Sequence, residues 1–223
     1  MDKDVLQLVR SRRSIRAFQP RPVPRDILRE ILDCAARAPS GSNIQPWQVI
    51  VLSGNPLERF RDALSAHAAE VPAAPEYHYY PQKWREPYLA RRRTVGWQLY
   101  GSLGIERGQH DRMTAQRLRN FRFFDAPVGL IFTMDRDLEI GSWIDLGLFL
   151  QNILIAARAF GLDSCLQAAF ADHPQKISEL LYIPPGRQVI CGMALGYADA
   201  LAPENGFVTE RAPLDHFVRF LED

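Results

Sequence analysis

Hydrophobic and polar positions follow two periods along this chain, one typical of helices and one typical of short buried strands. Apolar residues recur every three or four positions between residues 25 and 37, with charged residues on the other face, which predicts an amphipathic helix. Short apolar runs bounded by turn-forming residues predict buried strands at residues 47–52, 128–133 and 188–197. This alternation indicates a mixed α/β architecture, and the length of the chain fits a single domain over residues 1–223.

An irregular aromatic segment interrupts the helical periodicity in the middle of the chain. Residues 71–93 hold four prolines among tyrosine and tryptophan residues. The periodicity predicts a helix before this segment at residues 56–69 and helices after it at residues 94–108, 111–124 and 173–181. We interpret residues 71–119, partly irregular and partly helical, as a candidate cover over an active site. A surface excursion that is packed by its own aromatic rings is the alternative.

The most apolar helix is expected over residues 142–160. Ser142 can cap its start, and Asp145 falls in its first turn. The helix is apolar on nearly every side, which predicts burial all round, either inside one domain or at a subunit interface. Polar and charged side chains spread along it argue against a membrane span.

Composition favours small-molecule chemistry in an ordinary globular protein. The chain has 223 residues, of which 47% are hydrophobic and 24% charged, and its net charge of +1 gives no bulk attraction to nucleic acid or anionic membranes. Cys34, Cys165 and Cys191 lie far apart in apolar contexts, which predicts reduced buried thiols and a cytoplasmic location without a signal peptide. The five histidines lack metal-ligand spacing, and no dinucleotide or phosphate-loop motif occurs. We therefore expect no metal, and any cofactor must be bound by residues outside these motifs.

A polar loop follows the first amphipathic helix at residues 38–47. It contains Pro39, Ser40, Ser42 and Asn43, which offer two hydroxyls and an amide on a backbone that glycine allows to bend. Such a loop suits a flat ligand with polar edges. An ordinary turn is the alternative, because the same residue types dominate turns.

A basic segment at residues 12–18 is the second candidate site. Arg12, Arg13 and Arg16, with Ser14 among them, can form a fork-shaped receptor for a phosphate group. Basic clusters are mostly solvated surface, so the segment gains meaning only in combination with the loop.

Together, the two segments resemble the FMN-dependent nitroreductase family. Members begin with an R-x-S-x-R/K-x-F segment and, one helix later, carry P-S-x-x-N-x-Q-P-W. The corresponding stretches here are residues 12–18 and residues 39–47. The resemblance implies an α+β fold with a central mixed or antiparallel sheet flanked by helices, and an interlocked homodimer around a central helix.

The resemblance also implies where FMN binds. Arg12 and Arg211 would hold the phosphate, and residues 166–169 would lie along one face of the flavin and offer a backbone N–H toward N5. The full set of implied FMN-binding residues is Arg12, Arg13, Ser14, Arg16, Pro39, Ser40, Ser42, Asn43, Asn120, Leu166, Gln167, Ala168, Ala169 and Arg211, with residues 39–43 coming from the other subunit. Leu166 stands where proline is common and Ala168-Ala169 replaces the Glu-Gly pair of some members, which puts substrate preference in doubt. Thr209 sits where some members carry lysine.

The implied activity is NAD(P)H oxidoreduction on FMN N5, with nitroaromatic or quinone acceptors. NADH or NADPH would reduce the flavin and leave, and the small aromatic acceptor would then enter the same cleft in a ping-pong sequence. Two alternatives share the resemblance: a flavin-dependent dehalogenase and a non-catalytic flavin-binding protein. A nucleic-acid binder using Arg91–Arg93 is disfavoured by the near-neutral charge.

Overall fold

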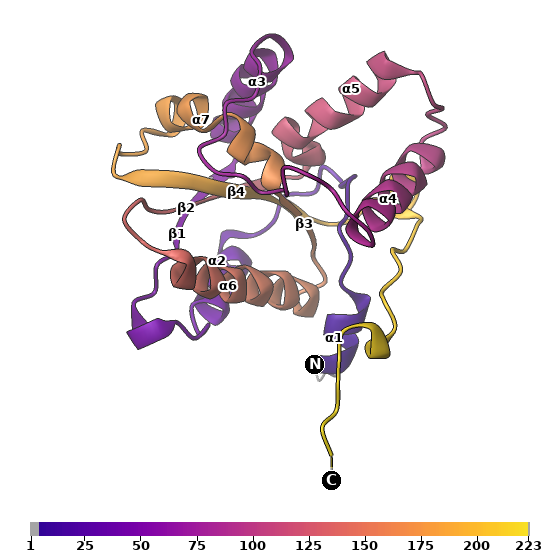
Figure 1. The fold of residues 1–223 in the computed structure, drawn as a ribbon. Helices are drawn as coiled ribbons and strands as arrows, with labels where there is room; N and C mark the ends of the chain where they lie inside the picture. The colour runs from indigo at the N-terminus through magenta and orange to yellow at the C-terminus, as the bar shows by residue number, and fades with distance from the viewer. Residues whose placement is uncertain (1–4, 223) are drawn as a thin grey trace.

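The computed structural model describes residues 5–222, and its centre is a four-stranded antiparallel sheet (Figure 1). The strands lie in the order β1 (Gln48–Ser53), β2 (Val128–Asp135), β4 (Arg187–Gly196) and β3 (Asp163–Gln167). Each neighbouring pair is antiparallel. The predicted α+β class is confirmed, and the three predicted strands form beside a fourth, β3, whose residues the sequence indicated only as extended. The predicted burial of the first strand is wrong, because β1 lies at the sheet edge and Leu52 is its one buried residue.

Two layers of helices enclose this sheet (Figure 1). One face carries α2 (Arg25–Ala35) and α6 (Ile140–Ala159), while the other carries α3 (Gly54–Glu70), α5 (His110–Leu118) and α7 (Pro174–Leu181). Outside these layers lie α1 (Val5–Ser11), next to α6, and α4 (Tyr88–Ser102), next to residues 203–205. The C-terminal segment runs away from the body beyond α1.

Strand β2 shows why the protein has a core on each side of the sheet. Successive side chains of a strand point to opposite faces. Accordingly, Leu130 and Phe132 pack with α2 and α6, whereas Ile131, between them, packs with α3. All three side chains are at most 1% exposed. An apolar run without polar interruptions is therefore what a strand covered on both faces requires.

Several helix boundaries differ from those expected, among them both ends of α4, which ends at Ser102 and not at residue 108, and the end of α5. α4 begins at Tyr88, because Pro87 occupies the position before its first turn and proline suits a helix start, so the irregular segment ends six residues earlier than predicted. α5 ends at Leu118, and a short 3-10 segment, Arg119–Asp125, replaces the predicted continuation to residue 124. In that segment Phe123 and Phe124 take left-handed backbone angles that bury both rings. Tertiary packing here overrides the local helical pattern.

Helix α6 corrects two further expectations. It begins at Ile140 after Glu139, and Ser142 lies buried in its first turn without acting as the cap. Burial all round is also wrong for a single chain, because Ile140, Ile144 and Leu148 are 79%, 65% and 41% exposed. Residues four apart share one face of a helix, so these side chains form an apolar stripe on α6. By length and composition alone this helix could cross a membrane, but its opposite face packs into the core against the sheet.

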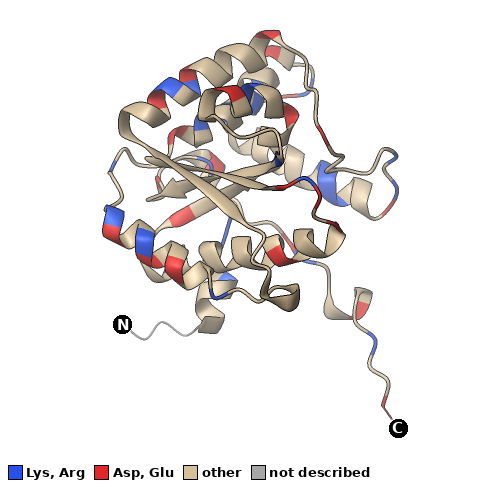
Figure 2. Cartoon of the chain, turned by 90° about the vertical axis from the view of Figure 1, so that its left-hand side faces the viewer, with Lys and Arg blue, Asp and Glu red and all other residues tan. Residues whose placement is uncertain are grey.

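The charged residues and two of the three cysteines lie where the sequence suggests. Figure 2 shows basic and acidic residues interspersed over the outer helices, as the net charge of +1 suggests. All three cysteines are free, and Cys165 and Cys191 are buried as predicted. Cys34 is exposed on α2, so its predicted burial is wrong. It falls on the solvent side of that amphipathic helix, where apolar neighbours in sequence do not imply burial.

Candidate functional site

The basic segment runs beside β3 in an extended conformation. The Ile15 amide donates to the Ser164 carbonyl at 3.1 Å, and Ser14 forms an isolated parallel bridge with the same strand residue. Ile15 and Ala17 are buried, whereas Ser14 and Arg16 are only partly buried. Because side chains alternate along extended backbone, Ser14 and Arg16 lie together on the side away from the core.

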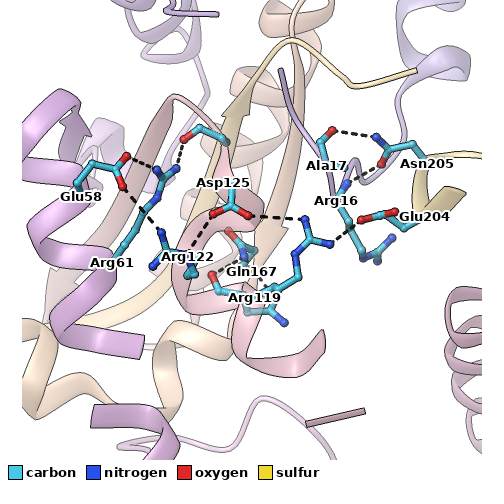
Figure 3. Close-up of polar contacts among 12 residues, drawn as sticks. Arg16, Ala17, Glu58, Arg61, Arg119, Arg122, Asp125, Gln167, Glu204 and Asn205 are labelled. Atoms are coloured by element: carbon cyan, nitrogen blue, oxygen red, sulfur yellow. Dashed lines mark hydrogen bonds and ion pairs between the residues drawn. The ribbon is translucent and has the colours of Figure 1, made fainter. Parts of the chain in front are cut away.

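Asn205 holds this segment in place (Figure 3). Its side-chain oxygen accepts from the Arg16 amide at 2.8 Å, and its side-chain nitrogen donates to the carbonyls of Ala17 and Asp199 at 2.8 and 2.9 Å. The residue is 6% exposed. Sequence reasoning missed Asn205, because an asparagine before glycine is read as an ordinary turn residue.

Arginines from both ends of the chain meet without acidic partners. Burial and the charge of Arg211 both lower the pKa of Arg12, which shows that the two cations lie within electrostatic reach of each other. Among residues 5–222, Arg211 itself donates only to residues 209 and 210. Within residues 5–222, no carboxylate lies within 4 Å of the side chains of Arg12, Arg13, Arg16 or Arg211. Asp163 senses the charge of Arg13, but at a distance beyond that of an ion pair. Guanidinium groups held together without ion-pair partners make an anion-binding site.

Two hollows meet at these arginines. The smaller, of about 50 Å³, is lined by Arg12, Arg13, Ser14, Arg16, Phe207, Thr209 and Arg211. The larger, of about 830 Å³, adds residues of α1 and α6, including Arg10, Gln151 and Arg158. The phosphate-binding residues predicted from both termini are therefore neighbours in space.

A separate cleft of about 530 Å³ begins at Arg16 and follows the end of β3. Residues 166–169 line it, as does Asn120, so with Arg16 six of the predicted site residues meet here. Gln167 is 2% exposed, and its side-chain nitrogen donates to the Asn120 carbonyl at 2.9 Å and to the Asn120 side-chain oxygen at 3.3 Å (Figure 3). Its Oε1 atom is buried and has no hydrogen-bond partner among the described residues. A buried acceptor left in this way fits a ligand that brings an N–H group.

The aromatic segment forms one wall of the cleft. Tyr77, Tyr79 and Tyr80 line it, and the Tyr77 hydroxyl donates to the Ile190 carbonyl. Burial raises the pKa of Tyr77, so this phenol stays protonated and remains a donor. The Ala74 amide donates to the Asp172 carbonyl at 2.8 Å, which ties the segment to the floor of the cleft.

The serine-asparagine loop, residues 38–47, lines neither the arginine hollows nor the 530 Å³ cleft. Its Gly41 amide donates to Asp145 Oδ2 at 3.2 Å, near the start of α6, and residues 41–45 are exposed. The arginine hollow instead reaches Arg158 near the end of α6. Thirteen helical residues separate Asp145 from Arg158, a distance of about 20 Å at 1.5 Å per residue. The structure thus brings together the two arginine segments, Asn120 and residues 166–169, but not residues 39–43.

The loop nevertheless has a defined shape. Ser42, Asn43 and Gln45 have positive φ angles of 49°, 58° and 49°. The Ser40 hydroxyl accepts from the Gln45 amide at 3.0 Å. Three non-glycine residues in the left-handed region are unusual in a solvated turn and are typical of functional sites.

Comparison with known proteins shows which family the chain belongs to. The sequence model of the Nitroreductase family matches residues 9–197, which is most of the chain. The chain belongs to the nitroreductase family. The recognition made from the two N-terminal motifs is therefore confirmed.

Relatives of this nitroreductase-family chain match it over almost its whole length. A nitrobenzene nitroreductase of Ectopseudomonas oleovorans is 42% identical, with 97% of this chain and 96% of the relative covered. A 4-nitrobenzoate reductase of Nocardioides sp. strain LMS-CY is 41% identical, with coverage of 97% and 89%. The crystal structure of an FMN and NADPH-dependent nitroreductase, NfnB from Sphigopyxis sp. strain HMH, superposes with a TM-score of 0.96 at 35% identity, covering 99% of this chain and 100% of that one.

Proposed function

We propose that this protein is an FMN-dependent NAD(P)H oxidoreductase that reduces nitroaromatic or quinone-type acceptors. The observation that carries the proposal is the pairing of an uncompensated arginine cluster with an adjoining cleft that contains a buried, unpartnered acceptor. A phosphate and a flat heterocycle with N–H groups, joined in one molecule, would satisfy both. The names of the relatives support the nitroaromatic class.

The residues present fit FMN. Arg12 and Arg211 would hold its phosphate, and Ser14 and Arg16 would meet the pyrimidine and ribityl groups. Asn120 and residues 166–169 would line the ring, with Gln167 Oε1 accepting from a ring N–H. When bound, FMN supplies a hydride carrier at N5. Arg16, which is permanently charged, would stabilise negative charge on the adjoining ring.

The site would be completed by a second copy of the chain. Pro39, Ser40, Ser42 and Asn43 line neither the cleft nor the arginine hollows within one chain. The exposed apolar stripe of α6 begins close to the loop, since Asp145 contacts Gly41. Apolar stripes of this kind are typical of subunit interfaces. A homodimer packed along α6 would carry each loop toward the partner's cleft.

Anaerobic mixing tests the proposed function. NADPH or NADH should bleach the yellow of the bound flavin, and a nitroarene added afterwards should restore it. Tyr77, Tyr79 and Tyr80 would shield the cleft from water during this exchange. Protein that binds FMN but is not bleached by either nucleotide would be a flavin carrier and not a reductase. A halophenol that restores the colour and loses halide would point instead to dehalogenation.

One cleft for both substrates predicts ping-pong kinetics. The sequence has no separate dinucleotide motif, so donor and acceptor would occupy the same cleft in turn. Double-reciprocal plots at several fixed acceptor concentrations should therefore be parallel, and oxidised nucleotide should compete with the acceptor. Intersecting lines would instead require a complex that holds donor and acceptor together.

A further inference from the structure

Arg117 is a second cation at the cleft, distinct from the arginine cluster. It belongs to the last turn of α5, and its side chain lines the 530 Å³ cleft but not the hollow around Arg12 and Arg211. Its backbone is fixed, because the Asn120 side-chain nitrogen donates to the Arg117 carbonyl at 2.9 Å. Asn120 in turn accepts from Gln167. Arg117 is thus anchored to the residues that line the proposed ring site.

No acidic group neutralises Arg117 by direct contact. Within residues 5–222, no carboxylate oxygen lies within 4 Å of its guanidinium group. Asp172 is the only acidic residue among the described residues that line the cleft. Burial raises the pKa of Asp172, and the charge of Arg117 opposes that rise, so the two groups sense each other without forming an ion pair. An exposed, unpaired guanidinium at the mouth of a cleft attracts anions.

The opposite wall of the cleft is aromatic. Tyr77, His78, Tyr79 and Tyr80 line it, and the tyrosine rings offer flat surfaces for stacking. A ligand recognised by both walls would therefore carry an aromatic ring and a negative group on its edge. A carboxylate matches the planar fork of a guanidinium best, because two parallel hydrogen bonds can form.

We infer that Arg117 selects acceptors that carry a ring carboxylate, so that nitrobenzoates are preferred over neutral nitroarenes of the same size. This inference rests on the proposed function and names the substrate class of the same site. Arg117 acts as a specificity-determining residue and takes no part in hydride transfer. Its contribution should weaken as ionic strength rises, because the residue is exposed.

The Arg117→Gln variant tests the inference against a matched pair of acceptors. For 4-nitrobenzoate, kcat/KM should fall about tenfold, as expected for loss of one charge-assisted contact. For its methyl ester, which has the same ring and no charge, kcat/KM should stay within about twofold, because no ion pair is lost. Arg91→Gln, an exposed arginine of α4 outside the cleft, is the control and should change neither value.

Three outcomes would overturn the inference. In the Arg117→Gln variant, kcat/KM could fall equally for both acceptors, or it could fall for neither. Alternatively, only the KM for NADPH could rise, which would assign Arg117 to a nucleotide phosphate. Calorimetric titration with 4-nitrobenzoate and with its methyl ester adds a readout without turnover. A different result would separate the inference from the proposed function. If neither nucleotide reduces the protein, but it binds 4-nitrobenzoate and not the methyl ester, and Arg117→Gln abolishes this binding, the proposed function is refuted and the inference is retained.

Discussion

Replacing Arg12 by alanine should yield a colourless protein whose affinity for FMN is at least about 100-fold weaker, because a partly buried phosphate would lose a charge-assisted partner. Arg12 belongs to a segment whose backbone hydrogen-bonds to β3. Of the two proposed phosphate ligands, only Arg211 would remain. The ratio of flavin to protein absorbance after purification, followed by fluorescence titration with added FMN, measures the loss.

Arg29→Ala is the matched control for Arg12→Ala. Arg29 is exposed on α2 and lines none of the hollows described above, so its loss removes the same charge from a distant surface. It should retain the FMN content of the unaltered protein. If Arg12→Ala were to retain stoichiometric FMN, the assignment of the phosphate to the arginine cluster would be wrong.

Replacing Asn205 by alanine should lower the free energy of unfolding by about 2–4 kcal/mol, because buried backbone groups would lose their partners. The Arg16 amide and the Ala17 carbonyl each bond to this side chain, which is 6% exposed. FMN affinity should fall as well, since the arginine segment would no longer be fixed. Urea unfolding of the FMN-free protein separates the loss of stability from the loss of cofactor.

Asn55→Ala provides the comparison for Asn205→Ala. Asn55 is exposed near the start of α3 and should change the free energy of unfolding by less than about 0.5 kcal/mol. Equal stability of the two variants would mean that Asn205 does not hold the segment. Loss of stability with unchanged FMN affinity would mean that the segment keeps its place without Asn205.

Periodicity predicted the elements of the fold better than their limits. The apolar runs at β2 and β4 were sufficient because strands covered on both faces need no alternation. The run at β1 predicted the strand but not its exposure at the sheet edge, where Leu52 is its one buried residue. The end of α5 could not be predicted, because Phe123 and Phe124 leave the helical conformation to pack against residues distant in sequence. The exposed stripe of α6 was not predicted for a related reason, since composition does not say which side of an apolar helix faces away from the core.

The sequence motifs predicted which residues belong to the candidate site, but not how those residues are arranged in space. The motifs named Arg12, Arg211 and residues 166–169, and the structure brings each near a common hollow or cleft. The supporting groups were not predicted, because nothing local marks Asn205 as buried or Arg117 as lining the cleft. Nor does anything local show that Gln167 Oε1 has no hydrogen-bond partner among the described residues. Which residues oppose each other depends on contacts between distant segments, and a single sequence does not record them.

The central claim is that each FMN site combines arginines of one copy with the serine-asparagine loop of another. The most direct test co-expresses Arg12→Ala and Asn43→Ala chains with different affinity tags and isolates the mixed dimer. Each variant alone should bind FMN poorly, since every site in it has lost one contributor. In the mixed dimer, the intact Arg12 of one chain meets the intact Asn43 of the other, so we predict one FMN per dimer. A mixed dimer that binds no more FMN than the two single variants would contradict the account.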